Sequence, residues 1–596
     1  MSAIHYQITP RDPNAHIFQV GCTIDNPDPG GQRFRLPAWI PGSYLIREFA
    51  RQFIDVRAEA GGAAVVIRKE SKDVWRADPV RGPLTVFASI HAFDMSVRTA
   101  YLDTTRAYFN GPSIFLCPEG HEQSACLLDI VAPAGARYAN WRVATTLDSA
   151  GAPAHGFGRY RAANYDALID HPVEMGDFTL AAFDAGGVRH EIALTGRHAC
   201  DLERLARDLA RVCQAHIDLF GGPPPFDRYL FQITALGEGH GGLEHRSSTS
   251  LICRRDELPL PGDASVNDDY LRFLGLASHE YFHAWNVKRI KPLAFVPYDL
   301  TRESYTRQLW AFEGITSYYD DLALVRCGRI DAQRYLEVLG RAITSVLRTP
   351  ARFVQSIAES SFDAWIKFYR PDDNTPNAVI SYYQKGALVA LALDLTLREA
   401  QRGSLDDVMR TLWERHGRTG VGVPEDAIER IVCAQAGEEM HAFFARYVSG
   451  TEDPPVDVLL AALGIDWHLR ASNGANDRGG KAANGTAPRT WLGAKVGTDL
   501  RLQHVYGGGP AERAGLAPQD VLVAFDGTRA SVDAVNALVK RRAAGERVNV
   551  HVFRRDELMA VEVELAPAPL DTCYLSLRTD APERACALRN AWLATT

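Results

Sequence analysis

The first 165 residues alternate apolar and polar positions over short runs, a period of two that is typical of half-buried β-strands. The clearest runs span residues 5–8, 17–23 and 84–93. Turn-forming pairs such as Asn26-Pro27 and Gly30-Gly31 lie between them. The pattern predicts a β-rich N-terminal domain over residues 1–165.

Residues 166–470 begin with strand-like runs and then change to helical spacing. After the runs at 178–183 and 229–233, apolar positions recur every three or four residues, which predicts helices. These helical stretches are 202–219, 332–347, 387–399 and 405–418. We therefore expect a mixed second domain whose C-terminal part is helical.

The last part of the chain divides into three segments. Residues 471–490 are rich in Gly, Asn and Ala, which predicts a flexible linker. Residues 491–566 show the pattern of a compact β-rich unit, and 567–596 form a tail without an assigned structure. The chain is thus expected to be an α+β multidomain protein.

Composition narrows the functional class. The 596 residues leave room for about three or four domains. A hydrophobic content of 46% and a charged content of 23% are ordinary for soluble globular proteins. The net charge of −8 and the absence of a Lys/Arg-rich run argue against a nucleic-acid partner.

Neither a membrane span nor a secretory signal is predicted. The longest apolar stretch, near 387–393, is far shorter than the roughly 20 residues of a membrane helix. Residues 1–6 lack a charged n-region and an apolar h-region. The ten cysteines are scattered without a C-x-x-C pair, which argues against a thiolate zinc site and a disulfide framework. We expect a cytoplasmic protein with reduced core thiols.

The segment His279-Glu280-Tyr281-Phe282-His283 is an H-E-x-x-H motif in a predicted helix. Positions i and i+4 share a helix face, so two imidazoles can bind one ion while Glu280 activates a water molecule. Zinc suits such a site because it accepts neutral imidazole and makes water more acidic. The alternative is an exposed, charged helix turn.

The surrounding sequence favours the metal site. The helix is expected to begin near Ser265 or Asn267, with Asp268 and Asp269 at its N-terminus. Apolar residues at near-helical spacing predict that it is buried: Leu271, Leu274 and Tyr281. Cations are expected in its last turn, before Pro292 ends the helix: Lys288, Arg289 and Lys291.

Glu313 is the candidate third ligand. It lies in the helical segment 309–319 among apolar residues, where a carboxylate is costly unless it is paired or bound to a metal. The alternative is an ion pair with Arg307 or Lys288. With His279 and His283, Glu313 would complete a site for one catalytic Zn²⁺ with an open position.

These motifs carry a family resemblance. His279-Glu280-x-x-His283 followed by Trp310-x-x-Glu313-Gly314 resembles the gluzincin metallopeptidases, whose catalytic domain is thermolysin-like. The longer string from His279 to Ile290 resembles the glycyl aminopeptidase family, metalloproteases with a C-terminal PDZ domain. Residues 39–47 resemble that family's N-terminal domain. The loop around Gly42 is flanked by aromatics and is expected to pack in an interface or to reach the active site.

Two further segments extend the resemblance. Residues 241–248 resemble the family's form of the G-x-M-E-N exopeptidase motif, with His245 where other aminopeptidases carry Asn. Residues 382–387 resemble the Y-x-K-G-A segment. The resemblance implies catalytic roles for Glu280 and Tyr383, with Tyr382 as the register alternative. It implies substrate contacts in the exopeptidase segment from Gly241, Gly242, Glu244 and His245. Asn286 is expected to orient a metal-helix partner or to make an ordinary helix hydrogen bond.

The C-terminal unit resembles a bacterial PDZ domain in its segments 509–516, 520–522 and 526–527, although Gln519 stands where that pattern usually has Gly. A PDZ domain would bind an extended peptide or protein ligand by strand addition. The alternative is a packing domain without a ligand.

The motifs together predict a zinc aminopeptidase that removes small N-terminal residues, Gly or Ala by resemblance, from peptide substrates. A PDZ-recruited gluzincin endopeptidase and an inactive peptide-binding scaffold are the alternatives.

Overall fold

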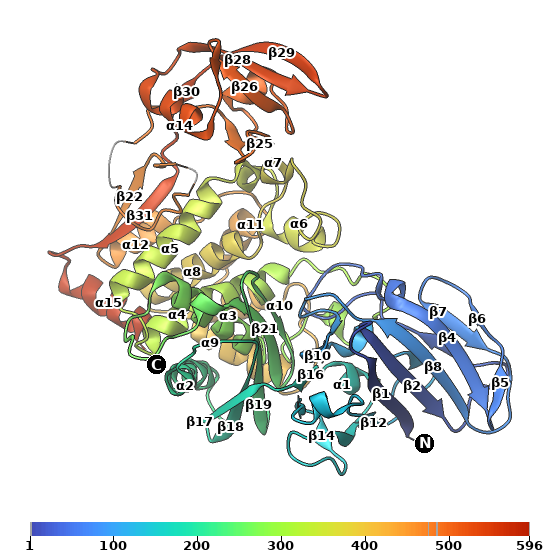
Figure 1. Ribbon diagram of the computed structural model, residues 1–596. Coiled ribbons are helices and arrows are strands. Elements are labelled where there is room, and N and C mark those ends of the chain that lie inside the picture. The colour runs from blue at the N-terminus through green and yellow to red at the C-terminus, as the bar shows by residue number, and fades with distance from the viewer. Residues whose placement is uncertain (1–2, 475, 484–486, 595–596) are drawn as a thin grey trace. The chain divides into compact units, whose positions relative to one another are not determined.

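The computed structural model describes residues 3–474, 476–483 and 487–594 (Figure 1). The chain forms two compact units. The N-terminal unit ends at Ser304 and also includes Trp413–Gly422. The C-terminal unit contains Tyr305–Leu412 and the chain from Val423 onward. In the described part of the chain, no helix has the length and apolar character that a membrane crossing requires.

An eight-stranded sheet dominates the start of the N-terminal unit (Figure 1, blue). Its strands, in spatial order, are β14 (Asp148–Ser149), β15 (Gly158–Ala162), β12 (Cys126–Ile130), β1 (Ile4–Asp12), β2 (Ile17–Ile24), β8 (Leu84–His91), β4 (Phe53–Ala60) and β5 (Ala63–Val65). Only β1 and β12 pair in parallel. Ile4, Tyr6 and Ile8 alternate into the core, as the period of two predicts. The β-rich N-terminal domain is confirmed.

Two four-stranded sheets complete this domain. One contains β13 (Arg142–Ala144), β16 (Val173–Gly176), β10 (Arg106–Phe109) and β9 (Ala100–Leu102). The other contains β11 (Cys117–Pro118), β3 (Arg33–Arg35), β7 (Val74–Ala77) and β6 (Ile67–Lys69). Helix α1 (Tyr165–Ile169) precedes β16. Because β16 pairs with β10, these sheets use residues beyond the predicted boundary at 165.

A five-stranded sheet follows in the same unit. Its order is β17 (Thr179–Ala185), β18 (Val188–Thr195), β19 (Arg228–Leu236), β21 (Ser248–Arg254) and β20 (Gly241–Glu244). The three inner strands are parallel, and the edge strands β17 and β20 are antiparallel to their neighbours. Helices α2 (Leu202–Phe220) and α3 (Asp268–Phe282) contact each other and this sheet.

Alternation along β19 fixes what each face of this sheet contacts. Tyr229 and Phe231 pack against the Tyr281 ring of α3. The Gln232 amide points the other way and donates hydrogen bonds to the carbonyls of Ala144 (2.9 Å) and Pro172 (3.2 Å) in the N-terminal domain. The sheet is therefore covered by α3 on one face and by the β-rich domain on the other, and β20 is left at an edge.

The C-terminal unit is mainly helical up to residue 462. Its α-helices are α4 (Ile315–Arg326), α5 (Ala332–Leu347), α6 (Ile357–Phe362), α7 (Thr375–Ala378), α8 (Gln384–Glu399), α9 (Leu405–Leu412), α10 (Ala427–Ala436), α11 (Met440–Tyr447) and α12 (Val456–Ala462). Helix α8 lies at the centre, since it contacts α4, α5, α9 and α12. The predicted helical part is confirmed.

A small β unit with its own apolar core follows. It contains the pair β24 (Ala494–Val496) and β25 (Leu502–Val505), and a sheet of β26 (Val521–Phe525), β27 (Thr528–Arg529), β28 (Arg547–Arg554) and β29 (Glu557–Glu564). Helices α13 (Pro510–Arg513) and α14 (Val532–Arg541) accompany them. Its core side chains include Leu502, Leu522 and Val550.

The segments on both sides of this unit contact the helical region. Strand β22 (Ile465–Arg470) pairs with β31 (Thr572–Leu577), and α15 (Glu583–Leu593) contacts α4 and α8. β23 (Thr490–Trp491) pairs with β30 (Ala566–Pro567), so the chain enters and leaves the small β unit at neighbouring strands. In the predicted linker, Asp477 forms an ion pair with Arg470 of β22, and Gly480 lies against α5. Residues 475 and 484–486 of that segment lie outside the described residues.

Candidate metal and peptide site

Helix α3 presents its two histidines on one face, as the motif predicts. The Asn267 side chain caps the helix by accepting a hydrogen bond from the Tyr270 N–H (2.8 Å), and Asp268 and Asp269 occupy the first turn. The His279 and His283 rings have centroids 4.6 Å apart. His283 is buried and His279 is half-buried. The pair can therefore point two ring nitrogens at one ion.

The end of this helix differs from the prediction. We expected it to continue to Pro292, but α3 ends at Phe282 and the chain enters a series of turns. The reason is visible at His283, whose Nδ1 lies 2.6 Å from the Asn286 carbonyl oxygen. A carbonyl only accepts, so Nδ1 carries the proton and Nε2 keeps its lone pair. Asn286 thus orients a metal-helix histidine, through its backbone rather than its side chain.

Glu280 lies against the glycine-rich edge strand β20. It is buried, with 6% of its surface exposed. A Cβ placed on Gly242 would lie 2.6 Å from Glu280 Cγ and still closer to the carboxylate. Only glycine allows the strand to approach the carboxylate this closely. A Cβ on Gly241, in contrast, would meet no atom within 4 Å, so that residue faces open space.

Glu244, at the end of β20, lies beside these catalytic candidates. One carboxylate oxygen of Glu244, one of Glu280 and a ring nitrogen of His283 all lie within 4.8 Å of one another. All three residues are buried. The Glu244 Oε1 atom has no hydrogen-bond partner among the described residues. A buried, unsatisfied carboxylate next to a candidate metal site is suited to a cationic ligand.

The N-terminal domain reaches the same carboxylate. A Cβ on Gly42 would lie 2.6 Å from Glu244 Cδ, so the Gly42 backbone touches Glu244. The flanking aromatics Trp39 and Tyr44 are fully buried and contact Phe295. The loop's aromatics therefore pack in an interface, as expected, and its glycine contacts Glu244, a candidate substrate-binding residue.

His245 lies in a cluster of charged residues around Asp170. It is buried, and its Nδ1 lies 3.4 Å from Asp170 Oδ1. Lys288 donates to the same oxygen at 2.7 Å, and the Arg246 N–H donates to Asp170 Oδ2 at 3.1 Å. Lys288 was expected as a cation in the last helical turn, but it lies beyond the end of α3 and is 2% exposed, because this ion pair holds it inside.

Burial alone would raise the pKa of Asp170, but the ammonium of Lys288 and the guanidinium of Arg246 outweigh it, and the pKa lies well below its ordinary value. Asp170 therefore stays ionised and keeps three groups in place behind Glu244. This hub was not predicted, since no motif marks Asp170 in the sequence.

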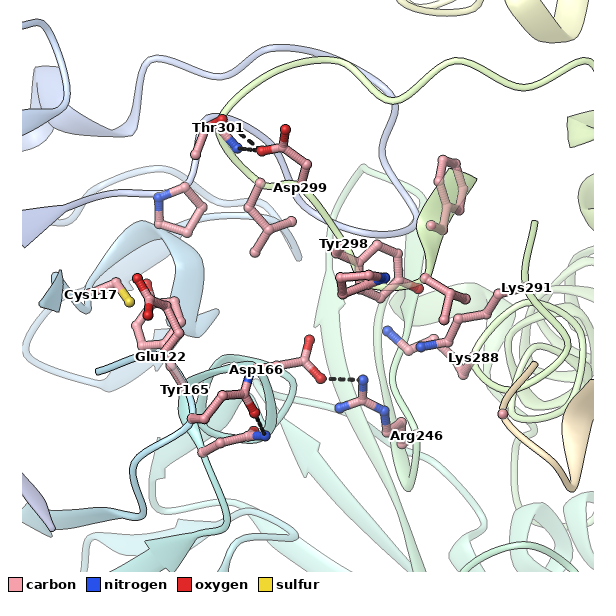
Figure 2. A pocket seen from close by; sticks show the side chains of 18 of the residues that line it. Cys117, Glu122, Tyr165, Asp166, Arg246, Lys288, Lys291, Tyr298, Asp299 and Thr301 are labelled. Atoms are coloured by element: carbon pink, nitrogen blue, oxygen red, sulfur yellow. Dashed lines mark hydrogen bonds and ion pairs between the residues drawn. The ribbon is translucent and has the colours of Figure 1, made fainter. Parts of the chain in front are cut away.

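Lys288 and Arg246 also line a cavity of about 850 Å³ (Figure 2). Figure 2 shows the Arg246 guanidinium directed at the Asp166 carboxylate, with Lys291 near the ring of Tyr298. The predicted site residues, all of which lie in the described ranges, do not line this cavity. The cavity is therefore distinct from the candidate site.

The C-terminal unit carries Glu313 in a π-helical turn, η6 (Trp310–Gly314), immediately before α4. Such turns are rare and often occur at functional sites. Glu313 is 2% exposed. A Cβ on Gly314 would lie 2.7 Å from Gly386 Cα, so η6 and α8 cross at two glycines. This contact explains why both motifs contain glycine, and it brings Glu313 near the start of α8.

Tyr383 immediately precedes α8. It is half-buried, whereas Tyr382 is fully buried. Burial raises the pKa of Tyr383 well above its ordinary value, and the Glu313 carboxylate raises it further. The phenol is therefore neutral at pH 7 and can donate a hydrogen bond. Its hydroxyl lies 3.2 Å from the Tyr369 hydroxyl, and Phe368 stacks on its ring.

Comparison with protein families finds matches over two parts of the chain. Residues 5–177 match the peptidase M61 N-terminal domain, and residues 272–389 match the M61 glycyl aminopeptidase domain. An aminopeptidase N family protein from Idiomarina loihiensis has 39% identity and a TM-score of 0.94, over 99% of this chain and 100% of that one. This chain belongs to the M61 glycyl aminopeptidase family.

Two other similarities are weaker. An M1 zinc metallopeptidase from Deinococcus radiodurans has 16% identity and a TM-score of 0.47, over 76% of this chain and 95% of that one. A probable periplasmic serine endoprotease DegP-like protein from Hahella chejuensis is 31% identical over 126 residues, 18% of this chain. That match covers 26% of the relative, so the M61 chain shares about a quarter of its length.

Proposed function

We propose that this M61 protein is a zinc-dependent aminopeptidase that removes small N-terminal residues from peptides. One observation carries the proposal: the carboxylates of Glu244 and Glu280 and the imidazole of His283 lie within 4.8 Å of one another. This closeness supports a site in which an anchor for a terminal amine lies beside a general base and a metal ligand.

The residues fit a zinc ion. The hydrogen bond from His283 Nδ1 to the Asn286 carbonyl puts the lone pair on Nε2, the atom that would bind a metal, and His279 lies one helical turn away. We propose Glu313 as the third ligand, because it is a buried carboxylate in a π-helical turn and the family resemblance gives it this role. When bound, the ion supplies Lewis acidity, which polarises a carbonyl and favours the ionisation of water.

The chain's own residues would carry the proton and the charge. Glu280 would take a proton from the attacking water and pass it to the departing amine. Tyr383 would donate a hydrogen bond to the developing oxyanion, and its neutral phenol suits this role. The half-buried position of Tyr383 favours it over the fully buried Tyr382.

Glu244 would set the position of cleavage. In a peptide the N-terminal nitrogen lies about 2.5 Å from the carbonyl carbon of its own residue, and each added residue lengthens the chain by about 3.8 Å. The carboxylate oxygens of Glu244 and Glu280 lie no more than 4.8 Å apart, a span that suits one residue between the amine anchor and the general base better than two. This geometry favours removal of single residues over dipeptides. The preference for Gly or Ala rests on the family resemblance.

The β unit spanning residues 491–566 would act as a PDZ-like domain. Its separate core and the PDZ-like segments of its sequence support this proposal. It would bind an extended peptide by strand addition and so favour longer substrates.

The test compares glycyl peptides with free and N-acetylated termini, using metal-replete and chelator-treated protein. We expect metal-dependent cleavage of the free-amine peptides and little cleavage of the blocked ones. Efficient cleavage of N-acetylated peptides would favour the endopeptidase alternative. Absence of hydrolysis by protein that holds stoichiometric zinc would favour the inactive scaffold.

A further inference from the structure

The loop that carries Gly42 is rigidly attached to the chain that follows the metal helix. The Trp39 indole N–H donates to the Asp299 carbonyl at 2.8 Å, and the Ala38 N–H donates to the Leu300 carbonyl at 2.7 Å. The Arg47 guanidinium donates to Ser43 Oγ at 2.6 Å and closes the loop from the other side. Gly42 therefore cannot withdraw without breaking these hydrogen bonds.

Gly42 occupies a position that only glycine tolerates. Its φ is +88°, and a Cβ would collide with the Glu244 carboxylate. One oxygen of that carboxylate also lies within 4.8 Å of Glu280 and His283. The Glu244 carboxylate therefore contacts the Gly42 backbone and lies close to the catalytic candidates.

We propose that Gly42 determines exopeptidase specificity, because its backbone forms the rear wall of the amine site. It holds Glu244 toward the catalytic residues and leaves no room for a residue N-terminal to the one whose amine Glu244 binds. An additional residue would need about 3.8 Å of chain where the Gly42 backbone lies. This inference rests on the proposed aminopeptidase function.

The test uses Gly42→Ala with Gly62→Ala as a matched control. Gly62 has a φ of +82° but no atom within 4 Å of a built Cβ, so the control reproduces the backbone strain without the collision. The substrates are a glycyl anilide and its hydroxyacetyl analogue, in which a neutral hydroxyl replaces the amine. Metal content and thermal unfolding are measured on every variant.

Gly42→Ala should lower kcat/KM for the glycyl anilide by about 10- to 100-fold, the size of a lost charge-assisted contact, and should change the hydroxyacetyl anilide little. In a Glu244→Ala background, Gly42→Ala should add no more than Gly62→Ala does, because the colliding carboxylate is gone. Wild-type protein should release glycine, and not the intact dipeptide, from a glycylglycyl anilide.

Three results would overturn the inference: equal activity of Gly42→Ala and Gly62→Ala, equal losses on both anilides, or first-turnover release of the dipeptide. A different result would refute the proposed aminopeptidase function itself: wild-type protein would show no metal-dependent preference for the glycyl over the hydroxyacetyl anilide.

Discussion

Gly242→Ala tests the general-base assignment without touching the base itself. A Cβ at this position would lie 2.6 Å from Glu280 Cγ, whereas ordinary contacts begin at 3.4 Å. Strand β20 has no positive φ at Gly242, so alanine brings a collision and no backbone strain. The strand is held by β21 and the helix by its packing, and the Glu280 carboxylate must therefore move by about 1 Å.

A displacement of this size can cost about 10²-fold, within the 10²–10⁴-fold that general-base catalysis contributes. We expect kcat to fall by about 10²-fold or more, which corresponds to at least about 2.7 kcal/mol of transition-state stabilisation. The overpacked variant should also lose about 1–3 kcal/mol of stability, which thermal unfolding would report separately.

The assay is steady-state hydrolysis of a glycyl anilide by folded, metal-loaded protein. Gly237→Ala is the control, because its Cβ would meet its nearest neighbour at 3.5 Å and its φ is not positive. Gly241→Ala, on the same strand, should change KM more than kcat, since its Cβ points into open space where a peptide would lie. A Gly242→Ala protein that keeps wild-type kcat would refute the role of Glu280.

Three further predictions follow from other parts of the structure. Tyr383→Phe should reduce kcat by about 10²–10³-fold with the metal retained, whereas Tyr369→Phe should reduce kcat by up to about tenfold. If Tyr382→Phe shows the large loss instead, the oxyanion donor is Tyr382 and not Tyr383. Asp170→Asn should destabilise the protein by about 3–5 kcal/mol because Lys288 is left buried without its anion. Because the pKa of Asp170 is depressed in the folded protein, the difference in unfolding free energy between wild type and Asp170→Asn should have its full value above about pH 4 and shrink below it. A difference that does not change with pH would exclude the ion pair as its cause. Joining Arg489 directly to Ala568, whose N–H donates to the Arg489 carbonyl at 3.1 Å, should remove the β unit and keep the hydrolysis of short peptides. Ending the chain at residue 480 should instead destabilise the protein, because it also removes β31 and α15. Loss of short-peptide hydrolysis in the soluble joined variant would show that the β unit completes the site.

Local chemistry made much of this architecture predictable. The Asn267 cap, the apolar face of α3 and the i, i+4 histidines are encoded within consecutive residues, so the start of the helix follows from the sequence. The end of the helix does not follow from the sequence, because the cations expected in its last turn make contacts outside the helix. Lys288 pairs with Asp170, more than a hundred residues away in the chain, and the Asn286 carbonyl turns toward His283.

The glycines show the same limit. The motifs identify Gly242 and Gly314 in the sequence. Only the structure explains why glycine is needed there, because it shows how closely Glu280 and Gly386 approach them. Gly42 was visible only as part of an unusual loop, and its contact with Glu244 joins segments about 200 residues apart. Tyr369 carried no signal, since its pairing with Tyr383 depends on how the segment before α8 folds.

The most direct test of the account is anomalous diffraction at the zinc edge on crystals of the metal-loaded full chain. The account predicts a single zinc peak with His279, His283 and Glu313 as its protein ligands, and Glu244 and Glu280 outside the coordination shell. A zinc ion held by Glu244, Glu280 and His283, or protein that binds no zinc, would contradict it.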